Sequence, residues 1–328
     1  MRAVQSALVV AISLASFAGI GDEPGDLAHA TQLPEDLGGI FINGDENFTA
    51  EHGVSAGNGT YLNPYIIESM EINGSSEGRG IYVQFTTAFL VIRNVTVHSG
   101  LIVLQENETS AGFTGSDGIN LRTAANCRIA NCTLRGNAEG ISVMWGCTNI
   151  VVEHNNITGN LRGISVESCS FVTMRENYVS RNLGDNVILD MASYCTLVNN
   201  TVVAPGKWSF TSVNLYAADH CEVHGNLVTN ANGLGVNVGF CSDCEVTNNT
   251  IMGNNVGITV YGSERITYSP NAFAGNSEDV QDWDSQESLS ESLVVLATII
   301  VTTFVTAIVV VVLMRRNKRN PPAGPPKQ

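Results

Sequence analysis

The chain is 328 residues long and 44% of it is hydrophobic, which excludes a wholly disordered protein. It carries 31 acidic and 16 basic residues, a formal net charge of −15. All the acidic residues lie between Asp22 and Glu291, and only ten of the basic residues lie there with them. Because so acidic a surface repels phosphate, the composition excludes nucleic acid as a partner.

The N-terminus has the pattern of a secretory signal. Met1 and Arg2 precede an apolar run from Ala7 to Ile20, which small residues follow. We therefore assign residues 1–30 to a signal peptide and exclude them from the fold. An uncleaved anchor or a buried helix is the alternative interpretation.

The C-terminus has the pattern of a membrane anchor. Residues 293–314 hold no charge and are long enough to cross a bilayer, and Arg315 and Arg316 follow at once. This predicts a single-pass protein of the cell membrane, with an extracellular ectodomain and a basic cytoplasmic tail at 315–328. Residues 276–292 are acidic and rich in serine, which predicts a solvated stalk. A soluble protein with a buried C-terminal helix is the alternative.

The middle of the chain is one repeat. A Gly-Ile-Ser-Val-like segment returns every 22 to 26 residues after one longer step, and its first apolar positions are Ile81, Ile119, Ile141, Ile164, Val187, Val213, Val236 and Ile258. A second column lies between them, with Cys132, Asn155, Asn177, Asn200, Asn226 and Asn249. An Asn at a tight bend can bond to backbone groups of its own or of a neighbouring coil.

Three short alternating segments per period predict three strands per turn. The fold class is therefore all-β, a right-handed parallel β-helix of about eight coils of 22–23 residues over residues 79–275, with residues 31–78 as its N-terminal cap. A leucine-rich repeat would need a helix or 3₁₀ turn in each period, and a propeller about 40 residues per blade.

At this point the chain resembles a known family. Residues 59–68 (GTYLNPYIIE) lead into Gly80-Ile81-Tyr82-Val83 and then into residues 89–94 (FLVIRN). This is similar to the opening of NosD-type, pectate-lyase-like right-handed β-helix proteins of archaeal cell surfaces, and it extends over residues 35–270. The resemblance implies the fold. It leaves function open, because such proteins include enzymes and binders.

The eight cysteines follow the repeat. Most fall in two inward columns, which favours free, buried thiols. Disulfides between stacked coils, Cys147–Cys169 or Cys221–Cys244, are the alternative. A soft-metal site for copper or zinc is a further alternative, and the NosD resemblance adds to it; its candidates are Cys241, Cys244, His220 and His224. No cofactor is predicted.

Two long turns, at 100–117 and 204–211, should emerge along the same edge of the Gly-Ile sheet. Polar, charged and aromatic side chains flank that sheet, as in a glycan site. The candidate ligand-binding residues are Asp117, Glu139, Arg162, Glu167, Asp185, Asp190, Trp208 and Tyr216. A solvated face with charge ladders is the alternative.

Catalysis is a second possibility on the same face. Glu167 and Asp190 would stack on adjacent coils about 5 Å apart, close to the carboxylate spacing of retaining glycosidases. Asp185 with Arg162 would suit a lyase instead. The leading hypothesis remains a surface protein that binds glycans, polysaccharide or surface glycoproteins; a tethered lyase or hydrolase and a NosD-like metal-handling protein are the alternatives.

Nine N-x-S/T sequons lie in the part predicted to be exported. Those at Asn199 and Asn248 coincide with bends of the repeat, so turn chemistry explains them. The predicted glycosylation sites lie outside the ladder, at Asn47, Asn58, Asn73 and Asn107.

Overall fold

The computed structural model describes residues 39–284, apart from 78, 108–109, 204–210 and 230–232. Among these residues, those up to Gln281 form one compact unit, and Asp282 begins a second. The predicted signal peptide, membrane segment and cytoplasmic tail lie outside the described residues, as does the stalk beyond Asp284. Among the residues described, none of the helices is long and apolar enough to cross a membrane.

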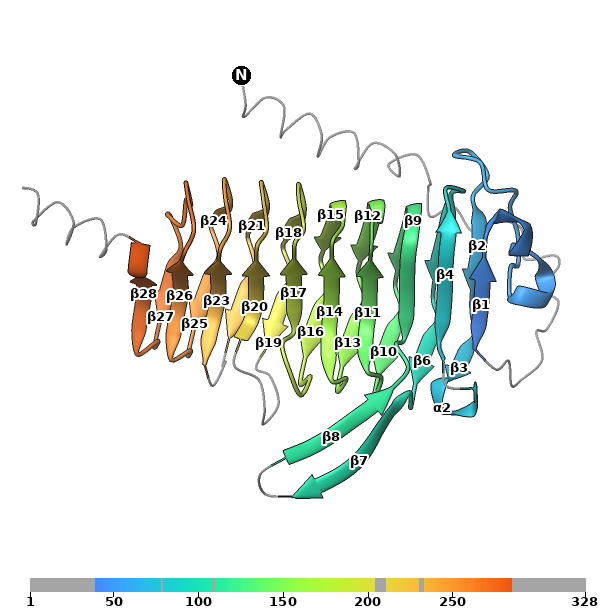
Figure 1. The fold of residues 1–328 in the computed structure, drawn as a ribbon, viewed down its shortest axis with the longest axis horizontal. Coiled ribbons are helices and arrows are strands. Elements are labelled where there is room, and N and C mark those ends of the chain that lie inside the picture. The colour runs from blue at the N-terminus through green and yellow to red at the C-terminus, as the bar shows by residue number, and fades with distance from the viewer. Residues whose placement is uncertain (1–38, 78, 108–109, 204–210, 230–232, 285–328) are drawn as a thin grey trace, which may run out of the picture. The chain divides into compact units, whose positions relative to one another are not determined.

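Each coil passes through three sheets in turn, which we call A, B and C (Figure 1). Sheet A contains β1 (Ile40–Asn43), β4 (Ile81–Thr86), the first part of β9 (Ile119–Ala130), β11 (Glu139–Met144), β14 (Arg162–Glu167), β17 (Val187–Asp190), β20 (Thr211–Tyr216), β23 (Leu234–Gly239), β26 (Val256–Tyr261) and β28 (Glu278–Asp282). Sheet B contains β2 (Tyr65–Glu68), β5 (Leu90–Arg93), the second part of β9, β12 (Thr148–Glu153), β15 (Ser170–Arg175), β18 (Thr196–Val198), β21 (Glu222–His224) and β24 (Glu245–Thr247). Sheet C contains β3 (Glu71–Asn73), β6 (Thr96–His98), β10 (Thr133–Arg135), β13 (Asn156–Thr158), β16 (Tyr178–Ser180), β19 (Thr201–Val203), β22 (Leu227–Thr229), β25 (Thr250–Met252) and β27 (Ala272–Ala274).

Neighbouring coils pair in parallel and in the predicted register. Ile141 faces Ile164 on the next coil, and Ile164 faces Val187. The predicted right-handed parallel β-helix of about eight coils is therefore confirmed. One more coil precedes Ile81, because β1 pairs with β4 and places Ile40 beside it, so residues assigned to the cap continue the same three sheets.

Four elements depart from the coil pattern. Two 3₁₀ turns, η1 (Asp45–Asn47) and η2 (Ala50–His52), lie at the N-terminal end of the stack, and α2 (Gly74–Glu77) follows β3. An antiparallel hairpin of β7 (Leu101–Asn107) and β8 (Ser110–Gly115) projects away from the stack between sheet C and sheet A. It occupies the first of the two predicted long turns.

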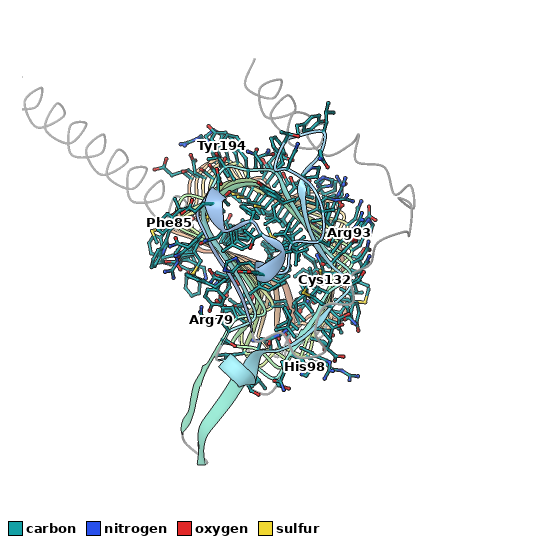
Figure 2. The ribbon with its side chains drawn as sticks, turned by 90° about the vertical axis from the view of Figure 1, so that its right-hand side faces the viewer. Arg79, Phe85, Arg93, His98, Cys132 and Tyr194 are labelled. Carbon is teal, nitrogen blue, oxygen red and sulfur yellow. The ribbon has the colours of Figure 1, made fainter. Side chains whose placement is uncertain are left out.

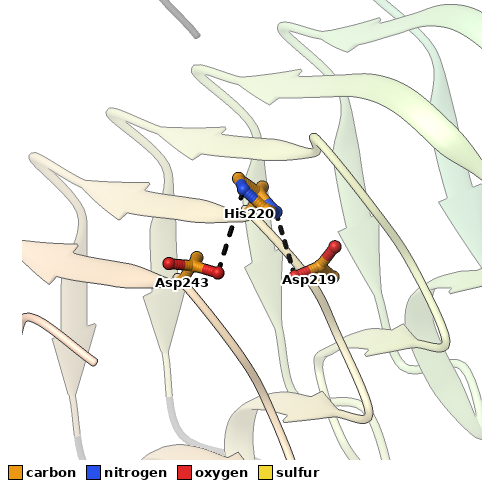
Figure 3. A group of neighbouring side chains, drawn as sticks. All are labelled: Asp219, His220 and Asp243. Atoms are coloured by element: carbon orange, nitrogen blue, oxygen red, sulfur yellow. Dashed lines mark ion pairs between the residues drawn. The ribbon is translucent and has the colours of Figure 1, made fainter. Parts of the chain in front are cut away.

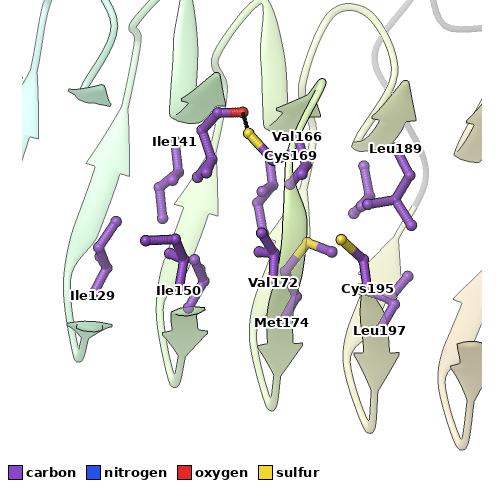
Figure 4. Packing of buried hydrophobic residues seen from close by; sticks show 14 of the residues in the cluster. Ile129, Ile141, Ile150, Val166, Cys169, Val172, Met174, Leu189, Cys195 and Leu197 are labelled. Atoms are coloured by element: carbon purple, nitrogen blue, oxygen red, sulfur yellow. Dashed lines mark hydrogen bonds between the residues drawn. The ribbon is translucent and has the colours of Figure 1, made fainter. Parts of the chain in front are cut away.

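The core is a set of stacked aliphatic columns (Figure 4). Alternate residues of each strand point inward, so Ile150, Val172 and Cys195 follow one another from coil to coil, with Ile129, Met174 and Leu197 in neighbouring positions. Burial of each aliphatic side chain contributes about 1.5–3 kcal/mol. Because like residues repeat at the strand spacing, a single sequence column fills a whole stripe of the interior.

The predicted Asn column forms a buried ladder. Asn155 Nδ2 donates to the Ile129 carbonyl at 3.1 Å and to Asn177 Oδ1 at 2.9 Å, and the Asn155 amide donates to the same Oδ1 at 3.0 Å. The pattern continues through Asn200, Asn226, Asn249 and Asn271. A second ladder, which the sequence reasoning missed, lies where sheet C meets sheet A and contains Asn137, Asn160, Asn182, Asn254 and Asn276.

The coils bend at residues in the left-handed region. Between sheets B and C these are Ser69, Asn94, Asn131, His154, Glu176, Asn199, Gly225 and Asn248. Between sheets A and B there are two such columns. The first, which we call the ridge, contains Gly44, Phe85, Thr123, Trp145, Ser168, Met191, Ala217, Phe240 and Gly262. The second, which we call the corner ladder, contains Asn126, Asn149, Phe171, Tyr194, His220, Asp243 and Arg265.

Candidate functional site

The outer face of sheet A gathers most of the predicted site residues. The residues at or just before the starts of its strands include Arg79, Asp117, Glu139, Arg162 and Asp185. The outward central positions are Tyr82, Asn120, Ser142, Ser165, Ile188, Asn214, Asn237 and Thr259. The last outward positions are Gln84, Arg122, Met144, Glu167, Asp190, Tyr216, Gly239 and Tyr261. We call these three columns the sheet A face.

Asp117, Glu139 and Arg162 join in one network across three coils. Asn120 Nδ2 donates to Asp117 Oδ2 at 2.7 Å, and Asp117 Oδ1 accepts the Glu139 amide at 3.2 Å. Arg162 Nη1 lies 3.1 Å from Glu139 Oε1. The three predicted residues therefore lie together, as the column assignment requires.

A second network includes Asp185. Asn214 Nδ2 donates to Asp185 Oδ2 at 3.3 Å, and Asn214 Oδ1 accepts from Asn237 Nδ2 at 3.0 Å. Asn237 Nδ2 also lies 3.4 Å from the hydroxyl of Tyr261. The side-chain amides of Asn214 and Asn237 keep the sheet A face polar on coils where the face has no carboxylate.

Burial changes the acidity of this face. Desolvation, and next to it the charge of Glu139, raises the pKa of Asp117 to about 6, although Asn120 donates a hydrogen bond to it. Burial also raises the pKa of Asp185 and, together with the Asp117 charge, that of Tyr82. Asp117 can therefore exchange a proton near neutral pH, a property that the column pattern alone does not reveal.

Buried polar atoms without a hydrogen-bond partner concentrate at sheet A. Among the described residues there are eight, and only His220 Nδ1, which lies 2.9 Å from Asp219 Oδ1, is elsewhere. Two, on Asn186 and Ser212, lie at the start of sheet A strands, and five lie on the sheet A face: Arg122 Nε, Glu139 Oε2, Ser142 Oγ, Asn237 Oδ1 and Thr259 Oγ1. Each such group costs about 1–3 kcal/mol unless a partner satisfies it.

The residues proposed for catalysis lie as the repeat predicts. Glu167 and Asp190 pair in register on β14 and β17, both half-buried. Arg162 makes its ion pair with Glu139, while its charge still lowers the pKa of Asp185 against the effect of burial. The structure thus adds Asp117 to the carboxylates that could move a proton.

Aromatic rings border the sheet A face on the side of the ridge. Phe240 lies edge-on to Tyr216 and to Tyr261, each at 5.4 Å between ring centroids. Gly239 makes room for this, because a Cβ there would come within 2.5 Å of the Tyr261 ring. The Arg122 guanidinium lies 3.9 Å from the centroid of the Trp145 ring. Trp208 lies outside the described residues.

The four sulfur and imidazole ligands suggested by the sequence do not converge. Cys241 and Cys244 are buried in the interior, whereas His220 and His224 face outward. Instead, Asp219, His220 and Asp243 come together outside the stack (Figure 3). His220 Nδ1 lies 2.9 Å from Asp219 Oδ1, and Nε2 lies 3.9 Å from Asp243 Oδ2.

Neighbours already engage the groups of this cluster. Both Asp243 oxygens accept from Arg265, at 2.8 Å each. The Tyr194 ring stacks on His220 at 4.9 Å and on Phe171 at 5.3 Å. The corner ladder thus continues from stacked rings into an ion-paired chain along one corner.

All eight cysteines are free and buried, as their columns predict. Burial raises the pKa of Cys132 to about 12 and raises that of Cys127 further. The thiols of Cys127 and Cys132 therefore stay protonated near neutral pH and serve as small apolar side chains.

Three predicted glycosylation sites lie in turns of the first coil. Asn58 Oδ1 accepts from the amide and hydroxyl of Thr60, and Asn73 Oδ1 accepts in the same way from Ser75. Asn47 Oδ1 accepts from the Asn43 amide. Asn107 ends β7, and its side chain lies outside the described part of the chain. Glycosylation of these four residues stays a prediction.

Two family models match the chain. One, described as right handed beta helix region, matches residues 38–202. The other, described as periplasmic copper-binding protein (NosD), matches residues 207–291. No curated protein matches significantly.

Solved structures with similar folds include the A-module of the mannuronan C-5 epimerase AlgE4 of Azotobacter vinelandii. It shares 19% sequence identity over 66% of this chain and 61% of its own, with a TM-score of 0.52. The full-length tailspike protein 2 of the Escherichia coli O157:H7 bacteriophage CAB120 shares 12% identity over 76% of this chain and 38% of its own, with a TM-score of 0.53. This chain thus spans less than two thirds of either protein, and the likeness shows the fold.

The described residues do not fit a copper site of the kind that the NosD description suggests. Soft thiols suit Cu(I), but the candidate thiols of Cys241 and Cys244 lie in the core, where hydrogen bonds between cysteines and burial raise their pKa values. The outward cluster offers one imidazole and two carboxylates, and Arg265 already neutralises Asp243. We therefore derive no function through a metal.

Proposed function

Because the chain belongs to the right-handed β-helix family and is a NosD-type member of it, we propose that it is a cell-surface protein that binds polysaccharide or glycoprotein glycans along the sheet A face. The proposed signal peptide would export it, and the proposed helix at 293–314 would anchor it in the membrane. The basic tail would then remain in the cytoplasm.

One observation carries this proposal. Five buried polar atoms of the sheet A face have no partner, and they include two hydroxyls, an amide oxygen, a carboxylate oxygen and a guanidinium nitrogen. Sugar hydroxyls both donate and accept hydrogen bonds, so they can satisfy such a mixed set once neighbouring side chains of the face move aside and expose it. The rings of Phe240 and Tyr261 lie on the coils of Asn237 and Thr259, at one end of this set, and with Tyr216 on the preceding coil they offer apolar surface to the sugar ring.

A second candidate function is a polysaccharide lyase or hydrolase at the same place. Asp117 favours it, because a carboxyl with a pKa of about 6 can act as a general acid or base near neutral pH. Glu167 and Asp190, which neighbour each other on β14 and β17, complete the set of candidates with Asp185 and Arg162. An enzyme of this kind would need the same bound glycan.

A polysaccharide array tests the binding function. The purified full-length chain, in a detergent without a sugar headgroup, should bind one class of immobilised polysaccharide reproducibly. Asn237→Ala, which removes one of the unsatisfied atoms, should weaken that binding at least fivefold. The matched control Tyr178→Ala removes an exposed ring from sheet C and should leave binding unchanged. A blank array with folded protein, or equal losses in both variants, would contradict the proposal.

The same preparation separates binding from catalysis. Reducing ends and unsaturated products are measured after incubation with the polysaccharide that binds. Under the enzyme alternative, Asp117→Asn and the double variant Glu167→Ala/Asp190→Ala lose turnover but keep measurable binding. Absence of any product from the wild-type protein over long incubation would reject that alternative and leave the binding function intact.

A further inference from the structure

The ridge alternates between large and small residues from coil to coil. Its large members lie on every second coil, and they are Phe85, Trp145, Met191 and Phe240. The small members that separate or follow them are Thr123, Ser168, Ala217 and Gly262. Backbone amides of the ridge donate to the neighbouring coil, for example Trp145 to the Glu167 carbonyl at 3.0 Å and Met191 to the Tyr216 carbonyl at 2.9 Å. These hydrogen bonds hold the large and small residues of the ridge in a fixed register from coil to coil.

These large residues occupy a backbone conformation that disfavours them. Their φ angles lie between +49° and +57°, where a bulky side chain is strained and Asn or Gly is not. These residues are between 50% and 58% exposed, so their burial and the ring contacts of Trp145 and Phe240 offset only part of this cost. Backbone strain that packing does not offset points to a role outside the fold.

The spacing between the large residues of the ridge matches the repeat of an extended polymer. Neighbouring coils lie about 4.8 Å apart, so the large ridge residues recur about every 10 Å along the stack. This is comparable to the length of a disaccharide unit in an extended chain whose successive sugars are flipped. Such a chain presents the same apolar ring face at every second sugar, and flat or polarisable side chains stack on that face.

The charge of the sheet A face selects against polyanions. Its outer columns hold five carboxylates, Asp117, Glu139, Glu167, Asp185 and Asp190, and three guanidinium groups, Arg79, Arg122 and Arg162. Arg162 is paired with Glu139, and Arg122 lies over Trp145. A uronate polymer would therefore meet net negative charge, whereas a neutral or amino-sugar polymer would not.

We infer that the ligand is a neutral or amino-sugar polysaccharide with an extended two-sugar repeat, which runs parallel to the axis of the solenoid and stacks alternate sugars on Phe85, Trp145, Met191 and Phe240. This inference rests on the proposed function and names the substrate class of the same face. The ridge residues position the polymer, while the sheet A face supplies its hydrogen-bond partners.

Oligosaccharide titrations test it with the full-length chain in the same detergent. Cello- and chito-oligosaccharides, which are extended and flipped at each unit, are compared with oligouronates of equal length and with oligomers of a helical β-1,3-glucan. Affinity should rise in steps of two sugars for the extended neutral or amino series and should be at least tenfold weaker for the other two. Trp145→Gly and Phe240→Gly should each lower affinity at least fivefold, and the control Tyr178→Ala should not change it.

The outcomes separate this inference from the function that it rests on. Binding of oligouronates or of the helical glucan in preference to the extended series would overturn the inference and leave polysaccharide binding standing. A smooth rise with each added sugar would overturn the two-sugar repeat. Absence of binding to every oligosaccharide and polysaccharide would overturn both. Melting temperatures of the two Gly variants check that lost affinity is not lost folding, because relief of strain should keep them at or above the wild-type value.

Discussion

Two corners of the solenoid place different residues in the same left-handed backbone conformation. Between sheets B and C, the left-handed position holds Asn four times, at Asn94, Asn131, Asn199 and Asn248, and otherwise mainly polar residues or Gly. At the ridge, between sheets A and B, the same conformation holds Phe twice, Trp and Met. Asn tolerates left-handed geometry and bulky residues do not. The first corner therefore follows the requirements of the fold, and the second departs from them beside the candidate binding face.

A single substitution should have its largest effect on stability in the interior of the solenoid, which both corners enclose. Val187→Asp places a charge in a fully buried column without a partner, so we expect a loss of more than about 4 kcal/mol and of cooperative unfolding. The adjacent Ile188 points outward, and Ile188→Asp should unfold cooperatively near the wild-type temperature. Urea unfolding and thermal unfolding, both followed by circular dichroism, check the two variants. Normal melting of Val187→Asp would show that the column assignment is wrong.

The Asn ladder should be the next most sensitive feature. Asn177→Ala leaves the Asn155 amide and the Val152 carbonyl buried without their partner, so we expect a loss of about 3 kcal/mol. Asn156→Ala removes an exposed amide from the neighbouring coil and should cost less than about 0.5 kcal/mol. Chemical denaturation of both variants gives the difference. Equal stability of the two would contradict the structural role of the ladder.

Asp117 should make stability depend on pH. Its folded pKa of about 6 exceeds its unfolded value of 3.8, so the folded state binds the proton more tightly. The stability that this group contributes is present below about pH 4 and is lost as the pH rises through about 6. Relative to Asp117→Asn, the wild-type free energy of unfolding should fall by about 2 kcal/mol between those limits.

The measurement is the urea midpoint of both proteins across that pH range. Glu51→Gln, which removes an exposed carboxylate far from Asp117 in the sequence, controls for the loss of one charge. A constant difference between wild type and Asp117→Asn at all pH values would show that Asp117 is not perturbed.

The smallest expected changes in stability distinguish the two corners most directly. Met191→Gly removes a left-handed strain and little burial, so we expect it to stabilise the protein by about 1 kcal/mol. Asn199→Gly, at the other corner, replaces a residue that already tolerates this geometry and should change stability by only a few tenths of a kcal/mol. Thermal unfolding measures both. A destabilised Met191→Gly would mean that the ridge is packed for the fold.

The sequence predicts the part of this structure that repeats. Hydrophobic columns such as the one through Ile164 and Val187 follow from the period, because parallel stacking places like residues together. The first Asn ladder follows in the same way. The second ladder, through Asn137 and Asn160, was missed because the long turns interrupt its period, although the alignment of columns would have revealed it.

The candidate site is predicted only in outline. The columns place Asp117, Glu139 and Arg162 on one face, but the pKa of Asp117 depends on desolvation, which a periodic pattern does not encode. The proposed sulfur and imidazole set fails to converge because residues next to each other, such as His220 and Cys221, alternate between outside and inside. The ridge was visible in the sequence as a residue four positions after each first apolar residue, but only its left-handed backbone gives that column its meaning.

The most direct test of the account combines binding and stability in one variant. Phe85, Trp145, Met191 and Phe240 are all replaced by Gly in the full-length chain, and the melting temperature and the affinity for a chito-oligosaccharide are measured on the same sample. We expect a melting temperature equal to or above that of the wild type, with affinity reduced more than a hundredfold. A lower melting temperature with affinity retained would show that the ridge serves the fold and that the polysaccharide site lies elsewhere.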